Sequence, residues 1–361
     1  MKKMLFIIQL PPPTYGVTTV NKFVYESNLI NENAEKHLIK VNYSQSLSEL
    51  KKITLKKIFL IIKLWFKLLK ELISYKPDYV YYTVPPTGIG FYKEIPNILL
   101  LKLFNKKPIF HLHGKGIQQA VNTQLKKRIY NYILSKAIII HLSEGLLRSE
   151  LQNLILKKSK LFAAPNGVET YNIMPKKVSD SIDFLFLSNI QESKGIFLLL
   201  DAFSELARIN QKIRLNIIGG FRDQETEIEF NKIIDQNNLR EKIQLHGPLY
   251  GVDKHKKIAQ CDVLVHPSFN DAFPLVILEA MQHGLAIIGS DQGAIPEIIN
   301  PKVGYVFQTG NRNKLLEHMQ NIASNTETRK LMQNNAKELF YKQYTIQHFE
   351  ERMSEIFRQL S

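Results

Sequence analysis

Short apolar runs recur along this chain, and most end in a loop that contains glycine or proline. In the first half the runs lie at residues 4–10, 79–84, 108–113 and 137–143. In the second half they lie at residues 183–188, 214–220, 242–247, 262–268 and 285–290. Segments with helical spacing lie between them, for instance at residues 17–29, 195–208 and 223–236. This alternation is typical of parallel sheets that are covered by helices on both faces.

The length favours two such α/β domains, because 361 residues are long for one core. Residues 163–183 lack periodicity and carry Pro, Asn-Gly and Ser, so they predict a linker. We expect an N-terminal domain over residues 1–165 and a C-terminal domain over 166–345, with a cleft between them. Residues 346–361 predict a closing helix that packs back toward the N-terminal domain.

Charge is divided unevenly between these halves. The chain has a formal net charge of +15, yet residues 1–165 hold 26 Lys and Arg against 9 Asp and Glu. The remaining residues hold 22 basic and 24 acidic side chains. The excess therefore lies in the first half, which favours attraction of that half to a polyanion or an anionic surface.

The segment 51–76 is the most basic part of the first half. At 100° per residue its lysines gather on one side of a helix: Lys52, Lys56, Lys63, Lys67 and Lys70. Its apolar residues cover the opposite side: Ile58, Ile61, Ile62, Trp65, Leu68, Leu69 and Leu72. Two interpretations stay open. The helix either buries its apolar side in the core and solvates its lysines, or lies on an anionic membrane surface.

Cysteine usage and the first apolar run bear on location. Cys261 is the only cysteine, which excludes an intramolecular disulfide and suits a reducing cytoplasm. Residues 4–10 are too few for a membrane span of about 20 residues and precede three prolines. They predict a buried strand rather than a signal peptide. We expect a cytoplasmic protein, peripheral on the inner face of the membrane.

Residues 266–284, HPSFNDAFPLVILEAMQHG, predict a ligand site in the second half. Pro274 fits a helix start, so residues 275–282 form a helix whose first free N–H groups belong to Leu275 and Val276. Such an N-terminus at a strand end is a seat for phosphate. Glu279, one turn further, could accept hydrogen bonds from a ribose diol, and Asp271 would lie beyond the phosphates. The alternative is a turn residue at Asp271 and a solvated acid at Glu279.

Lys194 gives this site a cation. It follows the apolar run 183–188, so it lies at another strand end of the same sheet. There it could neutralise a diphosphate, although a lone Lys-Gly is most often a surface feature.

Taken together, these motifs resemble the donor-binding domain of family 4 retaining glycosyltransferases over about residues 160–310. The segments that carry the resemblance are SNIQESKG (188–195), IIGG (217–220), HGP (246–248), residues 261–284 and GAIPE (293–297). The resemblance implies a GT-B architecture, with two doubly wound Rossmann-like α/β domains facing across a cleft. It also implies a nucleotide-sugar donor, in this family often a UDP-sugar, and no metal.

The resemblance assigns roles to individual positions. Asp271 would contact the transferred sugar, although the family usually has the longer Glu there. Asn189 stands where an Arg is usual, five residues before Lys194, which would neutralise the leaving diphosphate. We expect the donor-binding residues to be Gly16, Asn189, Lys194, Leu275, Val276 and Glu279. The expected catalytic residues are Asp271, Lys194 and His113.

Gly16 and His113 complete that set from the first half. Gly16 follows the first apolar run and keeps one of the family's paired glycines, where a structural turn is the alternative. His111 and His113 share one face of a strand, and either could be a core histidine. His113 stands beside Gly114 at the strand tip, where relatives carry a sugar-contacting histidine. No third ligand accompanies them, so we expect no metal site.

Three classes of function fit parts of this sequence. The leading one is a glycosyltransferase that acts on a glycan or a lipid-linked acceptor of bacterial cell-surface synthesis. A GT-B nucleotide-sugar epimerase would share the fold without the ordered motifs. A nucleic-acid-binding protein would explain the pI of 9.5, but aromatic-interleaved basic runs and zinc or helix-turn-helix signatures are missing from the sequence. We therefore expect no nucleic-acid partner.

Overall fold

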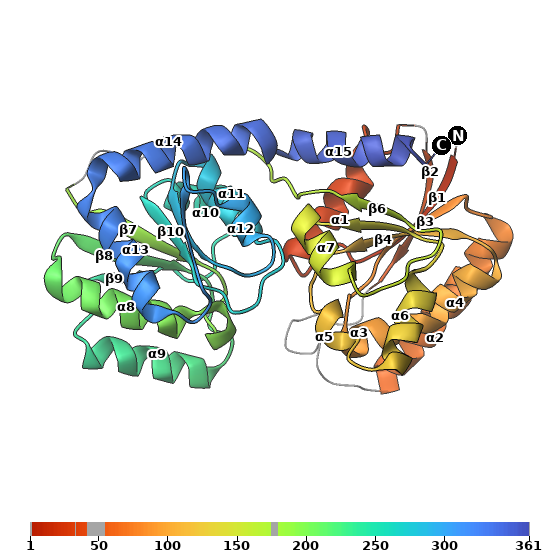
Figure 1. The fold of residues 1–361 in the computed structure, drawn as a ribbon, viewed down its shortest axis with the longest axis horizontal. Coiled ribbons are helices and arrows are strands. Elements are labelled where there is room, and N and C mark those ends of the chain that lie inside the picture. The colour runs from red at the N-terminus through yellow and green to blue at the C-terminus, as the bar shows by residue number, and fades with distance from the viewer. Residues whose placement is uncertain (1, 33, 42–54, 175–179, 361) are drawn as a thin grey trace. The chain divides into compact units, whose positions relative to one another are not determined.

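The computed structural model describes residues 2–32, 34–41, 55–174 and 180–360 (Figure 1). The chain splits into two compact units, one of Met1–Asn166 with Gln347–Ser361 and one of Gly167–Ile346. The beginning of the basic segment and the middle of the predicted linker lie outside the described residues. Each unit is built around its own parallel sheet.

The first unit contains a sheet of six parallel strands in the order β2-β1-β3-β4-β5-β6. Its strands are β1 (Lys2–Ile8), β2 (Ala34–Lys40), β3 (Tyr79–Thr83), β4 (Lys107–Leu112), β5 (Ile138–His141) and β6 (Lys160–Ala163). The central strands are buried because helices cover both faces, which explains their continuous apolar runs. The predicted parallel sheet is confirmed.

Helices of the first unit pack apolar side chains onto this sheet. They are α1 (Gly16–Glu26), α2 (Leu55–Ser74), α3 (Gly88–Tyr92), α4 (Ile95–Leu103), α5 (Ile117–Ala120), α6 (Gln124–Leu134), α7 (Glu144–Leu151) and α15 (Ile346–Arg358). Helices α2, α4 and α6 lie side by side (Figure 1). The closing helix α15 belongs to this unit, where Phe357 packs against Tyr81.

The second unit repeats the design with strand order β12-β11-β10-β7-β8-β9, again all parallel. Its strands are β7 (Ile182–Leu187), β8 (Ile213–Ile218), β9 (Ile243–Leu245), β10 (Val263–His266), β11 (Ala286–Ser290) and β12 (Gly304–Phe307). Its helices are η2 (Glu192–Lys194), α8 (Ile196–Ile209), α9 (Gln224–Gln236), α10 (Gly251–Ile258), α11 (Leu275–Gln282), α12 (Ile295–Ile298), α13 (Arg312–Ser324) and α14 (Thr326–Gln343).

Strand order reverses between β1 and β3 in the first unit and between β7 and β10 in the second. Sheets of this type bind ligands outside the carboxyl ends of the strands at such a reversal. In the second unit the loops that leave β7 and β10 are those that carry Lys194 and Asp271. The topology therefore places the predicted residues where a ligand is expected.

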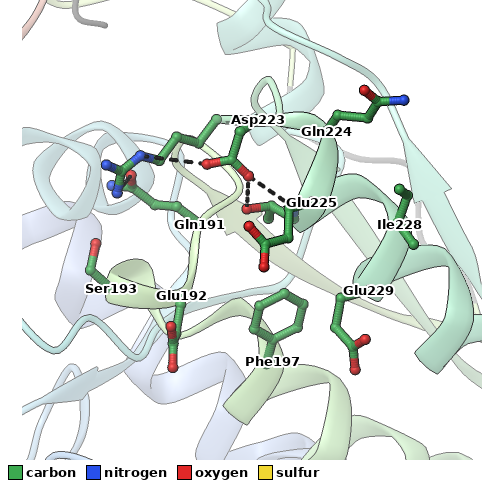
Figure 2. A pocket seen from close by; sticks show the side chains of 11 residues that line it. Gln191, Glu192, Ser193, Phe197, Asp223, Gln224, Glu225, Ile228 and Glu229 are labelled. Carbon is green, nitrogen blue, oxygen red and sulfur yellow. Dashed lines mark hydrogen bonds and ion pairs between the residues drawn. The ribbon is translucent and has the colours of Figure 1, made fainter.

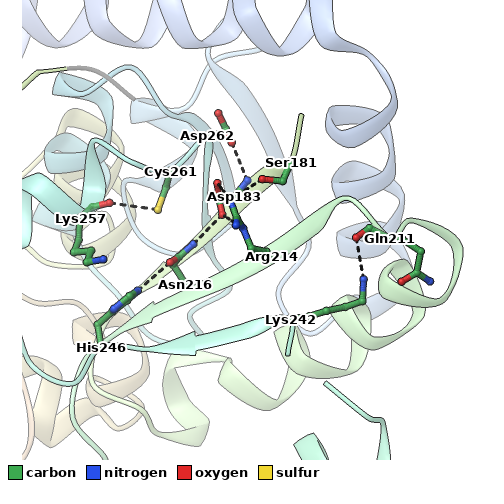
Figure 3. Close-up of polar contacts among 10 residues, drawn as sticks. All are labelled: Ser181, Asp183, Gln211, Arg214, Asn216, Lys242, His246, Lys257, Cys261 and Asp262. Atoms are coloured by element: carbon green, nitrogen blue, oxygen red, sulfur yellow. Dashed lines mark hydrogen bonds and ion pairs between the residues drawn. The ribbon is translucent and has the colours of Figure 1, made fainter. Parts of the chain in front are cut away.

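A polar network fixes the start of β7 against its neighbours (Figure 3). Asp183 is buried, and it accepts hydrogen bonds from Arg214 Nε at 2.9 Å and from Asn216 Nδ2 at 3.3 Å. His246 Nε2 lies 2.9 Å from Asn216 Oδ1. A buried carboxylate needs such partners to offset its lost hydration. The His246 of the HGP motif therefore has a structural partner in this network.

Candidate functional site

Two loops of the second unit meet at the carboxyl end of the sheet because Gly195 has no side chain. Gly195 has a φ of 77°, and a Cβ atom there would lie 2.1 Å from the carbonyl oxygen of Pro267. The backbone N–H of Phe269 donates to the carbonyl of Ser193 at 3.0 Å. The loop that follows β7 is thus held against the loop that follows β10.

Asp271 is the centre of an ion-paired cluster at this junction. Its Oδ2 accepts hydrogen bonds from Lys194 Nζ at 2.7 Å and from His266 Nε2 at 2.9 Å. Burial raises the pKa of Asp271, but the hydrogen bond from His266 and the charge of Lys194 outweigh burial and hold that pKa well below its ordinary value. The carboxylate is therefore negative at neutral pH and keeps the Lys194 ammonium in place.

Glu279 has a different lysine as its partner. Its Oε1 accepts a hydrogen bond from Lys254 Nζ of α10 at 2.8 Å. Its other oxygen, Oε2, is buried and has no hydrogen-bond partner among the described residues. A buried oxygen without a partner is costly. A hydroxyl donor such as a ribose diol would satisfy this oxygen.

The N-terminus of α11 offers free donors close to Asp271 in the sequence. The helix begins at Leu275 after Pro274, and no side chain caps it. Within the described part of the chain, the N–H groups of Leu275 and Val276 have no hydrogen-bond acceptor. Free N–H groups and the positive end of a helix dipole bind phosphate. The helix bounds predicted from the sequence agree with the observed helix.

Asn189 follows β7 in the same unit. It is exposed, and no hydrogen bond joins its side chain to another described residue. A neutral amide there can donate to a phosphate oxygen but supplies no charge. The structure brings Lys194 and Asp271 into contact, while Asn189 contacts neither of them through a hydrogen bond.

Gly16 and His113, the other two predicted site residues, lie in the first unit. Gly16 is the first residue of α1 and does not have a positive φ. No left-handed conformation therefore requires glycine there. His113 Nε2 is buried without a hydrogen-bond partner among the described residues.

Burial makes His113 a neutral imidazole. It lowers the pKa of His113 to about 3, and the charge that His141 would carry adds to the effect. The rings of His111 and His113 lie 4.0 Å apart between centroids, which confirms that they share a face. His111 is the core histidine of the pair, because its Nδ1 lies 2.5 Å from the hydroxyl of the buried Tyr81.

His266 and Lys254 are site residues to which the sequence interpretation assigned no role. The signal for His266 was its position as the last residue of a strand that enters the site. Lys254 lies 25 positions before Glu279, and only the packing of α10 against α11 brings the two together. Neither contact follows from the spacing of a motif.

A pocket of about 890 Å³ is lined by residues of η2 and α9 (Figure 2). Four carboxylates line it, those of Glu192, Asp223, Glu225 and Glu229. Arg222 lies among them but pairs with Asp223 at 3.8 Å. This excess of negative charge would repel a phosphate group.

The described part of the chain contains neither a cluster of metal-ligating side chains nor a helix that could span a membrane. No group of three or more His, Cys, Asp or Glu side chains there could hold a metal ion. None of the described helices is both long enough and apolar enough to cross a membrane.

Comparison with known proteins identifies the second unit. Residues 168–339 match the family model of glycosyl transferases group 1. A curated relative is the gpi3 subunit of phosphatidylinositol N-acetylglucosaminyltransferase from Schizosaccharomyces pombe, 25% identical over 148 residues. The match covers 40% of this chain and 32% of that protein. The chain thus spans about a third of the length of the first curated relatives that it matches.

Solved structures show the same fold over the whole chain. Sucrose-phosphate synthase from Thermosynechococcus elongatus superposes with a TM-score of 0.77 at 16% identity, covering 100% of this chain and 99% of that one. HepE from Anabaena, in complex with UDP and glucose, gives 0.73 at 16% identity, covering 99% and 100%. The predicted pair of Rossmann-like domains is confirmed, and the fold is that of GT-B glycosyltransferases. Residues 168–339 form a glycosyl transferases group 1 domain.

Proposed function

We propose that the protein is a retaining, metal-independent glycosyltransferase of the family 4 type, with a nucleoside-diphosphate sugar as its donor. The observation that carries this proposal is the arrangement at the carboxyl ends of β7 and β10. There Lys194 contacts Asp271, the N–H groups of Leu275 and Val276 are free among the described residues, and Glu279 keeps one oxygen without a partner.

Each part of this arrangement suits one part of the donor. The free N–H groups of α11 and the ammonium of Lys194 would hold the diphosphate. Glu279 would accept the ribose hydroxyls, and Asp271 would face the sugar. His113 from the first unit, as a neutral imidazole, would accept or donate one hydrogen bond to a sugar hydroxyl.

The reaction needs little more than electrostatic stabilisation. The bond between the anomeric carbon and the diphosphate oxygen breaks, and the diphosphate leaves with the electron pair. A hydroxyl oxygen of the acceptor then bonds the anomeric carbon on the same face, and its proton passes to the leaving phosphate. Lys194 and the N-terminus of α11 stabilise the charge that develops on the diphosphate. Two protein-borne positive groups at this point support the proposal that no metal is required.

UDP is our proposal for the nucleotide, and its support comes from a neighbour in fold. HepE, which superposes over 99% of this chain, has been seen with UDP and glucose. Gly16, at the start of α1, and Asn189, in the loop that follows β7, would add contacts to the phosphates.

For the acceptor, we infer a glycan or a lipid-linked sugar in bacterial cell-surface synthesis, such as capsule, exopolysaccharide or O-antigen. The basic first half, with 26 Lys and Arg against 9 Asp and Glu, favours an acceptor presented at an anionic membrane. The name of the Schizosaccharomyces pombe relative includes a lipid, phosphatidylinositol. We place the work of the enzyme in the cytoplasm, at the inner face of the membrane.

Thermal unfolding with a panel of nucleoside diphosphates tests the donor site. A ligand at about 100 times its dissociation constant adds about 2.7 kcal/mol of stability, which shifts the unfolding midpoint by several degrees. We expect UDP to raise the midpoint of the wild type and to lose this effect in Glu279→Gln. Glu338→Gln, at an exposed position of α14, is the matched control and should respond as the wild type does. No shift with any nucleotide would refute the proposed donor site.

A further inference from the structure

Helix α2 carries two apolar stripes, and only one of them enters the core. Leu64, Leu68 and Leu72 are buried against the sheet of the first unit, and Trp65 and Leu69 pack beside them. A second set of large apolar side chains points to solvent: Phe59, Ile62, Phe66 and Ile73, with exposed fractions from 49% to 66%. We call this set the outer stripe. The sequence interpretation placed Ile62 on the apolar side of the helix, and in the structure this residue belongs to the exposed part of that side.

The members of the outer stripe are aligned along the helix. At 100° per residue its four members lie within about 60° of one another. They are spaced three, four and seven positions apart, so they follow one line over about four turns. Scattered single apolar residues are normal on a surface, but an aligned row with two phenylalanines indicates an interaction surface.

Lysines border this row. Lys63, Lys67 and Lys70 are exposed and lie on the adjoining side of α2. None of the three forms an ion pair within the described part of the chain. Glu71, the acid nearest to them on the helix, is engaged with His37 at 2.9 Å. Among the described residues, the border is therefore a row of positive charge without acidic partners.

The neighbouring helix α4 also exposes apolar side chains. Helix α4 packs against α2 and exposes Leu99 and Leu103, which are 43% and 79% accessible. Both helices lie on the same side of the sheet, as Figure 1 shows. Exposed apolar side chains thus occur on both helices of this side of the sheet.

We infer that the outer stripe and its three lysines dock the protein on an anionic lipid bilayer. Phenylalanine and isoleucine side chains would enter the boundary between headgroups and acyl chains, and the lysines would contact lipid phosphates. Helix α2 would lie in the plane of the interface, since no described helix can cross the membrane. Charge complementarity selects this occupant. A row of lysines that have no acidic partner among the described residues, beside apolar groups, fits anionic headgroups above a hydrocarbon layer.

Membrane docking adds a partner, the anionic bilayer, to the proposed function. It rests on that function only in so far as a lipid-linked acceptor gives docking its purpose. Docking would then confine the search for a lipid-linked acceptor to the plane of the membrane. Docking itself needs no donor, so its test is independent of the nucleotide site.

Sedimentation with vesicles tests the proposal directly. We expect the wild type to bind vesicles that contain phosphatidylglycerol and not vesicles of phosphatidylcholine alone, with affinity that falls as salt rises. The triple variant K63Q/K67Q/K70Q should bind about a hundredfold more weakly, at about fivefold for each lysine. F59S/F66S should weaken binding at least about tenfold without changing the salt dependence, since these side chains act by apolar burial.

A matched control removes the same charge elsewhere. Lys330, Lys337 and Lys342 are exposed on α14 of the second unit, and K330Q/K337Q/K342Q should bind vesicles as the wild type does. Equal losses in both triple variants, or retained binding in F59S/F66S, would overturn the proposal. A dimer in sedimentation equilibrium that F59S/F66S dissociates, without vesicle binding, would assign the stripe to a second copy instead.

Two measurements distinguish a loss of vesicle binding from a loss of folding and from a defect in the donor site. All five substituted α2 residues are exposed, so the unfolding midpoints should match that of the wild type. The thermal shift with UDP should also be unchanged in these variants. Failure of vesicle binding with a normal UDP shift would refute docking alone.

Discussion

Lys194 and Asp271 form an ion pair of 2.7 Å across the two loops that leave β7 and β10. The same oxygen of Asp271 also accepts a hydrogen bond from His266, the last residue of β10. Two donors on one carboxylate oxygen fix the ammonium of Lys194 at the strand ends. A phosphate that binds there meets a cation whose position is already set.

Replacement of Lys194 by Gln should weaken nucleoside diphosphate binding more than nucleoside binding. A charge-assisted hydrogen bond contributes about 1.5–3 kcal/mol, so the dissociation constant for UDP should rise by about tenfold to a hundredfold. Calorimetric titration with UDP and with uridine measures both. Lys232→Gln, at an exposed pair with Glu229 on α9, is the control and should leave both affinities unchanged. Equal effects of Lys194→Gln on UDP and on uridine would contradict the phosphate role.

Glu279→Gln should abolish the preference of the site for a nucleotide that carries ribose hydroxyls. In the wild type the Oε2 of Glu279, which has no partner among the described residues, can accept a hydrogen bond from a hydroxyl. A Gln side chain offers only one acceptor oxygen. UDP should therefore bind at least about tenfold more tightly than its 2′,3′-dideoxy analogue to the wild type, and about equally to the variant. Lys254→Gln should give an intermediate ratio, because it frees Glu279 to rotate. A ratio unchanged in Glu279→Gln would remove this residue from the donor site.

Asp271 should make the stability of the second unit depend on pH. Its folded pKa lies below the ordinary value of about 4, so the group contributes stability above that pH and loses it as the pH falls toward the folded pKa. Asp271→Asn should lower the free energy of unfolding by about 1–3 kcal/mol at neutral pH. The difference should shrink below about pH 4, as measured by urea unfolding. A difference in unfolding free energy that is the same at pH 7 and at pH 3 would contradict this role of Asp271. Asp253→Asn, at an exposed position of α10, is the control.

The strands that were not predicted are all at the edges of the sheets. They are β2, β6 and β12, whereas every central strand was predicted. Central strands are buried on both faces and therefore show continuous apolar runs. An edge strand such as AEKHLIK of β2 alternates exposed and half-buried residues, and its charged side chains help to prevent edge-to-edge pairing. Its apolar pattern is consequently too weak to find.

The site divides in the same way. Positions fixed by a strand end or a helix start could be placed from the sequence, as α11 and the loop with Lys194 show. Contacts that depend on how separate helices pack could not, and Lys254 on α10 is the example. The roles of the placed residues stay predictions that the variants above test.

Gly195→Ala should strongly destabilise the second unit, because the added methyl group meets backbone. The new Cβ would lie 2.1 Å from the Pro267 carbonyl oxygen, and an alanine at φ 77° is strained as well. We expect a loss of at least about 2 kcal/mol in the free energy of unfolding, because backbone rather than a flexible side chain must move. Gly220→Ala is the matched control, since its Cβ would have no heavy atom within 4 Å. Urea unfolding of both variants would show the contrast, and UDP titration would show whether the separated loops also lose the diphosphate. If Gly195→Ala were as stable as Gly220→Ala, the close approach of the two loops would not be what builds the site.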